Sequence, residues 1–191
     1  PDRIEAGTFA IAAAMTDGDL TLHYSQGHNL DALLMVLRET GAAVSESDDL
    51  IRIVGNGRPV AADITTDPFP GFPTDLQAQF MAMMCIARGS SRISETIFEN
   101  RFMHVPELAR MGADIQVDGG IALVRGQPSL TSAPVMATDL RASVSLVLAA
   151  LATDGVSEVS RIYHLDRGYS DLETKLGSCG ARLERIRGGH D

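Results

Sequence analysis

Three segments of the chain are apolar at almost every position, which predicts helices without a polar face. A helix that is apolar on every side has to be buried on every side. We therefore expect three helices at the centre of the fold, covered by the rest of the chain. They are predicted at residues 4–16, 75–88 and 139–153.

A second group of three helices is predicted to lie on the surface, because its members have one apolar stripe and one polar face. In the first of them, Leu33 and Leu37 lie on one side while Arg38 lies on the other. Each is followed by a Gly-Ala pair, in which glycine supplies the left-handed residue after the last turn. These helices are predicted at residues 30–40, 106–111 and 171–178, with Pro106 as a first helical residue and a capping box between Ser170 and Glu173.

Short segments of alternating polar and apolar residues predict the strands. One strand follows each buried helix, at residues 20–24, 91–95 and 156–162. Two hairpins are predicted, 42–45 with 50–54 and 113–117 with 121–124, and the turns are Asp48-Asp49 and Gly119-Gly120. Further strands are predicted at 62–66 and 134–137, ahead of the second and third buried helices, and at 181–187 near the end of the chain.

Two sets of glycines recur with nearly the same period, which indicates an internal repeat. Gly41, Gly112 and Gly180 are 71 and 68 residues apart, and Gly18, Gly89 and Gly155 are 71 and 66 residues apart. We infer three copies of one unit, at about residues 1–58, 59–127 and 128–191 of a single domain. The first copy lacks its opening strand, the last lacks its closing strand, and the chain begins at Pro1 without an initiator Met. We therefore expect a piece of a longer chain.

The composition of the chain excludes several classes of protein. The 191 residues carry a formal charge of −9, and 45% of them are hydrophobic, which suffices for a sizeable core and excludes disorder as the main state. An acidic chain with 5% aromatic residues and no Trp is poorly suited to nucleic acid, which needs basic patches and stacking surfaces. No apolar run reaches the roughly 18 residues that a membrane span requires. Two cysteines 94 positions apart favour a reducing cytoplasm over a disulfide framework.

Two of the buried helices begin with the same polar pair, Thr74-Asp75 and Thr138-Asp139. One explanation is structural, since Thr is a good N-cap and Asp in the first turn complements the helix dipole. The other is chemical, because Asp75 follows a stiff, proline-rich loop at 68–73 and Arg141 stands two residues after Asp139. Both explanations remain open on the sequence.

Arg101 and Arg167 occupy corresponding loops of the second and third repeats, and such loops converge on one end of a symmetric fold. Together with Arg141 they would form a cluster suited to phosphate or carboxylate, because guanidinium groups bind these anions bidentately. The alternative is a set of surface ion pairs, for which the candidate partners are Glu99, Asp139 and Asp166.

Histidine and cysteine offer weaker signals. His104 and His164 occupy matching loops, but neither has the neighbours of a metal site, so we expect no bound metal and either a structural role or a role in supporting residues of the site. Cys85 falls within a predicted buried helix, where core packing is its expected role.

Four strings resemble one known family. They are FPTDLQAQF at 72–80, ENRFMHVPEL at 99–108, MATDLRA at 136–142 and DRGY at 166–169. In this order they are similar to the signature of the UDP-N-acetylglucosamine enolpyruvyl transferases, within the EPSP synthase-like family, and the resemblance covers essentially the whole chain. It implies the C-terminal part of an α/β (α+β) protein with two similar halves. Each half would be an inside-out, barrel-like domain of three βαβαββ units with three buried helices.

The resemblance also implies a reaction, the first committed step of peptidoglycan synthesis. Enolpyruvate would move from phosphoenolpyruvate to the 3-hydroxyl of UDP-N-acetylglucosamine, with release of phosphate and without a cofactor. Asp75 would accept the hydroxyl proton, and Asp139 would assist proton transfer or orient the arginines. The implied substrate contacts are Thr74, Asp75, the backbone of Ile97, and Arg101, Arg141 and Arg167, the arginines binding phosphoenolpyruvate.

In that family the catalytic cysteine loop, a Lys–Asn pair and most uridine contacts come from the other half, which this sequence lacks. We therefore expect the N-terminal half of the same parent chain as a partner, and expect the piece alone to be inactive. Neither nucleic acid nor a membrane is expected as a partner. Two alternatives stay open: the sister enzyme that makes 5-enolpyruvylshikimate-3-phosphate, and a catalytically silent binding or regulatory module of the same fold.

Overall fold

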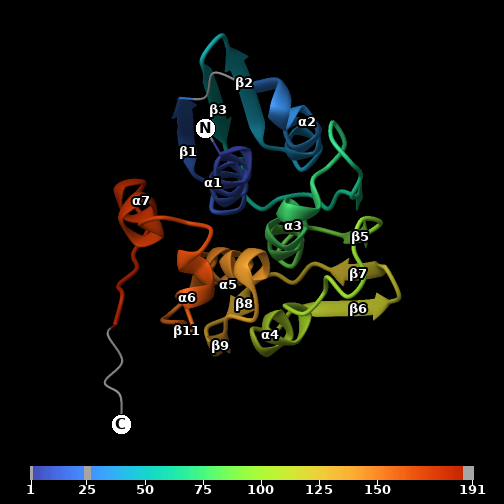
Figure 1. Cartoon of the computed structure of the whole chain (residues 1–191), viewed down its shortest axis with the longest axis vertical. Helices are drawn as coiled ribbons and strands as arrows, with labels where there is room; N and C mark the ends of the chain where they lie inside the picture. The colour runs from blue at the N-terminus through green and yellow to red at the C-terminus, as the bar shows by residue number, and fades with distance from the viewer. Residues whose placement is uncertain (1, 24–26, 187–191) are drawn as a thin grey trace.

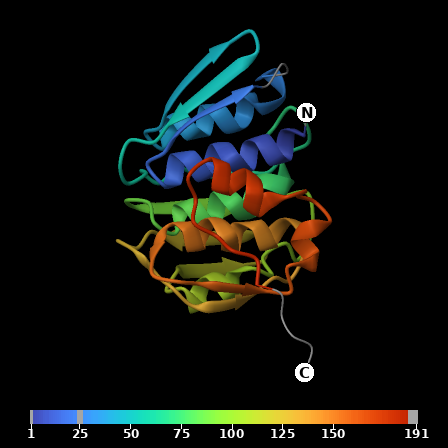
Figure 2. The same ribbon diagram turned by 90° about the vertical axis from the view of Figure 1, so that its left-hand side faces the viewer.

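The computed structural model describes residues 2–23 and 27–186. Three helices run side by side through its centre: α1 (Arg3–Met15), α3 (Gln77–Met84) and α5 (Leu140–Leu151). Figure 1 views them end-on and Figure 2 along their length, with α3 between the other two. Every residue of α3 is buried, as is every residue of α1 from Gly7 onward, which confirms the prediction for these two helices. In α5, Val147, Ala150 and Leu151 are partly exposed, so this helix is not buried on every side. None of the described helices is long and apolar enough to cross a membrane.

Helix α3 is shorter than predicted at both ends. At its start a 3-10 turn, η2 (Thr74–Leu76), replaces the first α-helical turn, so Asp75 lies just outside α3. At its end, the guanidinium of Arg58 donates hydrogen bonds to the carbonyl oxygens of Ile86 and Ala87. The N–H groups of Ile86 and Ala87 donate to Met83 and Met84, three residues back, so the α-helix ends in tighter turns before the end predicted for it.

Two larger sheets, of three and four strands, cover the central helices. The first contains β1 (Asp19–His23), β2 (Ala43–Ser47) and β3 (Leu50–Val54) in the antiparallel order β1-β3-β2. Helix α2 (Asp31–Glu39), entered through the 3-10 turn η1 (Gly27–Leu30), packs against α1 and β2. The strands predicted here are confirmed, except that residue 24 lies outside the described residues.

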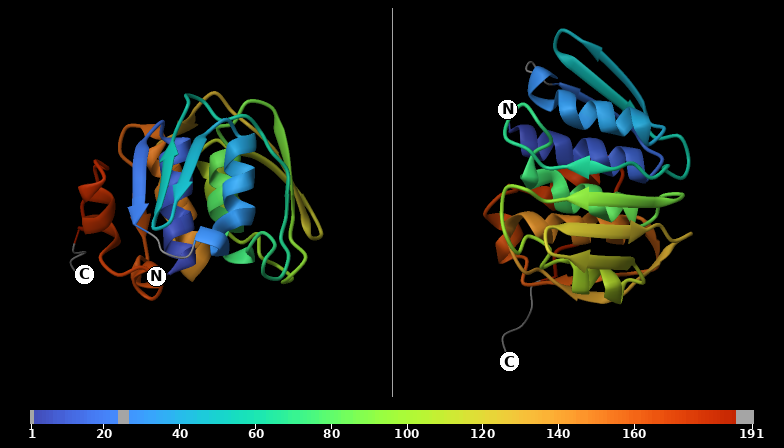
Figure 3. Two further views of the ribbon diagram at one scale, coloured as in Figure 1. Left: turned by 90° about the horizontal axis from the view of Figure 1, so that it is seen from above. Right: turned by 90° about the vertical axis from the view of Figure 1, so that its right-hand side faces the viewer.

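The second sheet lies alongside α3, as Figure 3 shows. It contains β4 (Ile64–Thr65), β5 (Ser90–Ser94), β6 (Asp114–Asp118) and β7 (Ile121–Arg125). The order is β4-β5-β7-β6, parallel between β4 and β5 and antiparallel elsewhere. Helix α4 (Val105–Arg110) follows β5 in the chain and begins one residue earlier than predicted, so Pro106 is its second residue.

The last part of the chain is less regular than predicted. Strands β9 (Pro134–Met136) and β11 (Glu158–Ser160) pair in parallel, as do β8 (Leu130–Thr131) and β10 (Thr153–Asp154), so the strand predicted at 156–162 shortens to β11. Helix α6 (Tyr163–Asp166), which no pattern predicted, precedes α7 (Leu172–Ser178). Residues 181–186 form no strand, contrary to prediction, because no described strand pairs with their backbone. Residue 187 lies outside the described residues.

The capping box predicted for α7 is also wrong. Asp171, and not Ser170, stands directly before the helix, with a left-handed backbone (φ 51°), and no side chain caps the helix. The Ser170 hydroxyl instead accepts from the Nζ of Lys175 at 3.3 Å. Because the left-handed turn redirects the backbone ahead of the helix, Ser170 does not reach the first free N–H groups.

Candidate functional site

Asp75 lies where α3 begins, between two arginines. The Nη1 atom of Arg101 is 3.0 Å from one carboxylate oxygen of Asp75, and the Nε atom of Arg141 is 3.7 Å from the other. Arg101 comes from the segment between β5 and α4, and Arg141 from the first turn of α5. The three side chains are 25–33% exposed, so a ligand can reach them from solvent. Residues far apart in the sequence are thus brought into one charged cluster.

Aromatic and hydroxyl groups hold Arg101 in place. Its guanidinium lies over the ring of Phe98, 4.6 Å from the centroid, in a cation–π contact. Its Nη1 atom also donates to the Oγ1 of Thr74 at 3.4 Å. Thr74, predicted as a substrate contact, therefore touches the same arginine that pairs with Asp75.

The buried carboxylate of Glu95 ties the neighbouring segments together. One of its oxygens accepts from the Ile97 N–H and the Thr66 hydroxyl, both at 2.9 Å, and the other accepts from the Thr74 hydroxyl at 2.8 Å. Because the Ile97 N–H is occupied, only its carbonyl oxygen is left for the backbone contact predicted there. Sequence reasoning missed Glu95 and Phe98. The one signal for Glu95 was a charged residue ending a strand that the pattern places against the core.

Asp139 is the N-cap of α5. One oxygen of its carboxylate accepts from the N–H groups of Arg141 at 2.9 Å and Ala142 at 2.8 Å. The Thr138 hydroxyl, predicted to be the cap, is buried and has no hydrogen-bond partner among the described residues. The structural explanation thus holds for Asp139, which fixes the turn that carries Arg141. The Asp75 carboxylate caps neither η2 nor α3, but it stands in the first turn of η2, so both the charge–dipole explanation and the chemical one stay open for it.

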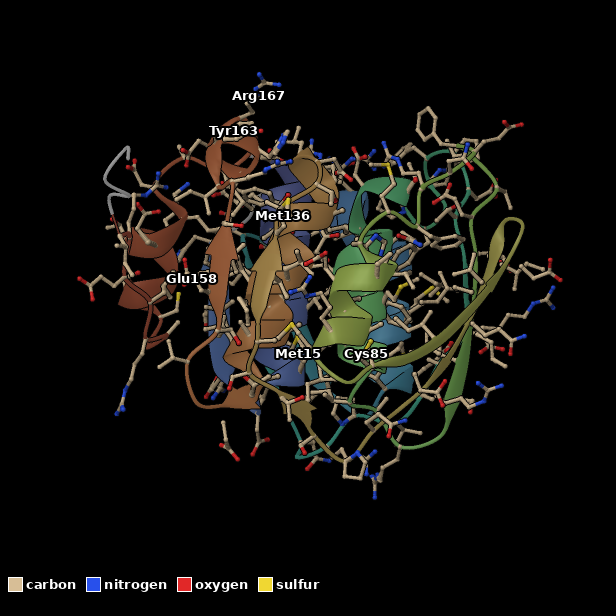
Figure 4. The ribbon with its side chains drawn as sticks, turned by 90° about the horizontal axis from the view of Figure 1, so that it is seen from below. Met15, Cys85, Met136, Glu158, Tyr163 and Arg167 are labelled. Carbon is tan, nitrogen blue, oxygen red and sulfur yellow. The ribbon has the colours of Figure 1, made fainter. Side chains whose placement is uncertain are left out.

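Arg167 lies at the same end of the molecule but does not join the cluster. Figure 4 shows it at the end opposite Met15 and Cys85, which mark where α1 and α3 finish, with its side chain extending outward. Within residues 2–23 and 27–186, its side chain forms no hydrogen bond or ion pair. Its neighbour Asp166 pairs with Arg185 at 2.7 Å. The structure therefore brings two of the three predicted arginines together, and a role for the third stays a prediction.

The two histidines are in different environments. His164 stacks on Tyr163, with ring centroids 4.2 Å apart. His104 is fully buried, and neither ring nitrogen has a hydrogen-bond partner among the described residues. Burial lowers the pKa of His104 to about 4, against the opposing effect of the Asp139 charge, so the ring is neutral at pH 7. In the part of the chain that the structure describes, no three His, Cys, Asp or Glu side chains are grouped to hold a metal.

Acid is expected to destabilise the fold through His104. The histidine pKa is about 6.5 in an unfolded chain and about 4 here, so below pH 6.5 the unfolded state binds the extra proton. The stability from neutral His104 is full above pH 6.5 and is lost as the pH falls toward 4, by about 3 kcal/mol in total. Denaturant unfolding of wild type and His104→Gln from pH 4 to 7 measures this difference. Equal pH dependence of the two proteins would contradict it.

Two hollows lie away from the charged cluster. One of about 420 Å³ sits where α1, α3 and α5 end, and its lining includes Met15 and Arg58. The other, of about 520 Å³, lies between α1, β1, α5 and α7. Neither is lined by Asp75, Arg101 or Arg141, so the concavity predicted around these residues stays a prediction.

The charged cluster combines two chemical abilities. A partly exposed carboxylate can accept a proton from a bound hydroxyl group. Two guanidinium groups beside it can bind phosphate or carboxylate and stabilise negative charge as it develops. Asp75, Arg101 and Arg141 are therefore suited to a reaction between a hydroxyl group and an anionic substrate.

Relatives among known proteins match nearly the whole chain. A family model described as EPSP synthase (3-phosphoshikimate 1-carboxyvinyltransferase) matches residues 1–176. The UDP-N-acetylglucosamine 1-carboxyvinyltransferase of Methylorubrum populi is 61% identical over 188 residues, which make up 98% of this chain and 44% of that protein. The protein of the same name from Geobacter metallireducens is 57% identical over 187 residues, 98% of this chain and 45% of that protein.

A solved structure agrees with these relatives. The enolpyruvyl transferase NikO from Streptomyces tendae is similar with a TM-score of 0.84 and 29% sequence identity, over 95% of this chain and 43% of that one. The chain thus spans less than half the length of each protein compared with it here.

Proposed function

Because this chain belongs to the EPSP synthase family and has the α/β fold of the enolpyruvyl transferases, we propose that it is part of an enzyme that transfers an enolpyruvyl group to UDP-N-acetylglucosamine. In this reaction the 3-hydroxyl of the sugar adds to phosphoenolpyruvate and phosphate leaves. The observation that carries the proposal is the Asp75 carboxylate held between Arg101 and Arg141. The name of the relatives, UDP-N-acetylglucosamine 1-carboxyvinyltransferase, favours the sugar nucleotide as acceptor.

In the proposed mechanism the charged cluster handles both the proton and the anion. Asp75 accepts the proton of the 3-hydroxyl as its oxygen bonds to C2 of phosphoenolpyruvate, and C3 takes up a proton from water as the double bond is consumed. Loss of a proton from C3 together with phosphate from C2 then restores the double bond in the product. Arg101 and Arg141 bind the charged groups of phosphoenolpyruvate and stabilise the departing phosphate. Asp139 keeps Arg141 in place through the first turn of α5. Arg167, which lies at the same end of the molecule, is the third anion-binding residue in this proposal.

Two further residues of this chain contribute to the acceptor site in this proposal. Thr74 lies between Arg101 and the buried Glu95, so it is positioned next to the anion as well as the proton acceptor. Ile97 follows Glu95 in the same segment and offers its carbonyl oxygen to the nucleotide sugar. Both residues are partly exposed to solvent.

We also propose that the chain is one half of its parent enzyme. Its three repeats are taken at about residues 1–58, 59–127 and 128–191, with the other half supplying the remaining substrate contacts. The share of each relative that the chain covers supports this proposal, because the matched residues make up 44% of the length of one relative and 45% of the other. The proposed location is the cytoplasm. Cys85, buried, and Cys179, exposed, are both free thiols, in keeping with a reducing compartment.

A second candidate acceptor is 3-phosphoshikimate, because the matching family model is described by that substrate. Phosphate release by the full-length enzyme separates the two. We expect turnover with phosphoenolpyruvate plus UDP-N-acetylglucosamine and none above the blank with phosphoenolpyruvate plus 3-phosphoshikimate. The reverse result would assign the chain to the second reaction. If no phosphate is released with either acceptor, both candidate reactions are contradicted and a catalytically silent module is favoured.

A further inference from the structure

A buried carboxylate, that of Glu95, is connected to Arg101 of the charged cluster. Glu95 is 7% exposed and follows directly after β5, at the start of the segment that leads to α4. Residues 95–104 of this segment form neither helix nor strand, so no regular backbone structure fixes the place of Arg101. The orientation of the Arg101 guanidinium therefore depends on contacts made by side chains.

The hydrogen bonds that join Glu95, Thr74 and Arg101 have only one possible direction. The Nη1 atom of Arg101 lies 3.4 Å from the Oγ1 of Thr74 and can only donate, so toward Arg101 the hydroxyl accepts. The single hydrogen of this hydroxyl then goes to a carboxylate oxygen of Glu95 at 2.8 Å, which accepts it. Glu95 therefore keeps a lone pair of the Thr74 oxygen directed at Arg101.

The other oxygen of Glu95 supports the aromatic ring that lies against Arg101. It accepts from the backbone N–H groups of Ile97 at 2.9 Å and Phe98 at 3.2 Å. The Phe98 ring makes the 4.6 Å cation–π contact with Arg101, and it is 52% exposed, so few neighbours pack around it. Both supports of Arg101, the Thr74 hydroxyl and the Phe98 ring, thus depend on one carboxylate.

We propose that Glu95 is a positioning residue, which holds the Arg101 guanidinium in the orientation that meets the anionic substrate. It acts through the Thr74 hydroxyl and the Phe98 backbone, and its own burial keeps it away from the substrate. Arg101 has several rotatable bonds, and fixing them before the substrate arrives removes an entropic cost from binding. This inference rests on the proposed function, because it takes Arg101 to bind phosphoenolpyruvate.

Glu95→Gln keeps the size of the side chain and changes the hydrogen bonding at one of its two ends. The amide oxygen has to stay with the N–H groups of Ile97 and Phe98, because these backbone groups can only donate. The NH2 group of the glutamine then faces Thr74, and the hydrogen of the Thr74 hydroxyl loses its acceptor. When that hydrogen turns toward Arg101, two donors face each other and the contact between Thr74 and Arg101 is lost.

In the full-length enzyme, we expect Glu95→Gln to raise the KM for phosphoenolpyruvate about tenfold, as for loss of one hydrogen bond to a charged group. The KM for UDP-N-acetylglucosamine should change by less than about threefold, and kcat should fall by less than about fivefold. A merely structural role predicts a different pattern, because fewer folded molecules lower the apparent kcat and leave both KM values unchanged. That pattern, together with a lower melting temperature, would overturn the proposal.

Glu46→Gln is the matched control. Glu46 belongs to β2 of the first sheet and forms an ion pair with Arg38 of α2, and both side chains are exposed. The same chemical change at this exposed pair should leave both KM values and kcat within about twofold of wild type.

A double substitution tests whether Glu95 acts through Arg101. In an Arg101→Lys background, Glu95→Gln should add less than about twofold to the KM for phosphoenolpyruvate, because lysine lacks the planar guanidinium that Glu95 orients. Full additivity would overturn the proposal. Should Glu95→Gln fail to fold, Thr74→Val removes the connecting hydroxyl and leaves Glu95 in place. It should raise the same KM about threefold, and an unchanged KM there would overturn the proposal.

These experiments also distinguish the inference from the function on which it rests. Absence of turnover by the wild-type enzyme with phosphoenolpyruvate and UDP-N-acetylglucosamine would remove the proposed function itself. Normal wild-type turnover with equal constants in Glu95→Gln and Glu46→Gln would remove only the role of Glu95.

Discussion

Asp75→Asn in the full-length enzyme is expected to lower turnover by roughly 10²–10⁴-fold, because an amide cannot accept the proton of the attacking hydroxyl. The fold should remain intact, since the side chain keeps its size and Asp75 caps neither η2 nor α3. Steady-state phosphate release measures the first effect and thermal unfolding the second. The alternative is that Asp75 serves only to link Arg101 and Arg141, and it predicts a loss of stability with near-normal turnover.

Asp114→Asn is the matched control for this substitution. Asp114 forms an ion pair with Arg125 at 3.1 Å, and both side chains are close to half exposed on the second sheet. The same chemical change there removes an exposed ion pair, which contributes little, and should leave turnover within about twofold. If Asp75→Asn also stays within about threefold of wild type while folding normally, Asp75 is not the base.

Residues 1–191 by themselves are expected to fold but to release no measurable phosphate from phosphoenolpyruvate and UDP-N-acetylglucosamine. They carry their own core, since side chains of α1, α3 and α5 pack together in it. The charged cluster, however, stays 25–33% exposed, and catalysis of this kind requires closure that excludes water. Circular dichroism tests whether the chain folds, and a phosphate-release assay tests whether it is inactive.

Mixing the chain with a separately made remainder of the enzyme is the complementary experiment. Among the described strands, β1 pairs only with β3 and β11 only with β9, so each leaves one edge for a further strand. Some turnover should return when the missing half is added. Robust turnover by residues 1–191 alone would show that the interpretation as one of two halves is wrong.

The spacing of apolar residues was sufficient to predict most of the scaffold. The largely apolar sequences of α1 and α3 demanded burial on all sides, and the alternating segments at β3 and β7 demanded one buried face. Both requirements are local, because they depend only on which side chains share a face. The prediction failed at residues 181–186, where strand formation depends on a partner and not on the segment itself.

Part of the candidate site could be predicted and part could not. The chemistry of Asp75, Arg101 and Arg141 could be inferred from residue type and matching places in the repeats. Whether Asp75 or Asp139 served as a helix cap could not, since both stand in the same Thr-Asp pair. The choice depends on whether a free N–H or a distant guanidinium is nearer to each carboxylate.

The sequence by itself therefore determined the three buried helices, most of the strands around them and the residue types that carry the proposed chemistry, because periodicity and side-chain chemistry are properties of short segments. Only the tertiary structure decided that Asp75 faces Arg101 and Arg141, that Asp139 caps α5, and that Tyr169 joins α1 to α3 through Thr8 and Gln79. Each of these contacts joins an oxygen to a donor whose distance is set by how the helices and loops pack, and residue spacing along the chain does not encode that distance.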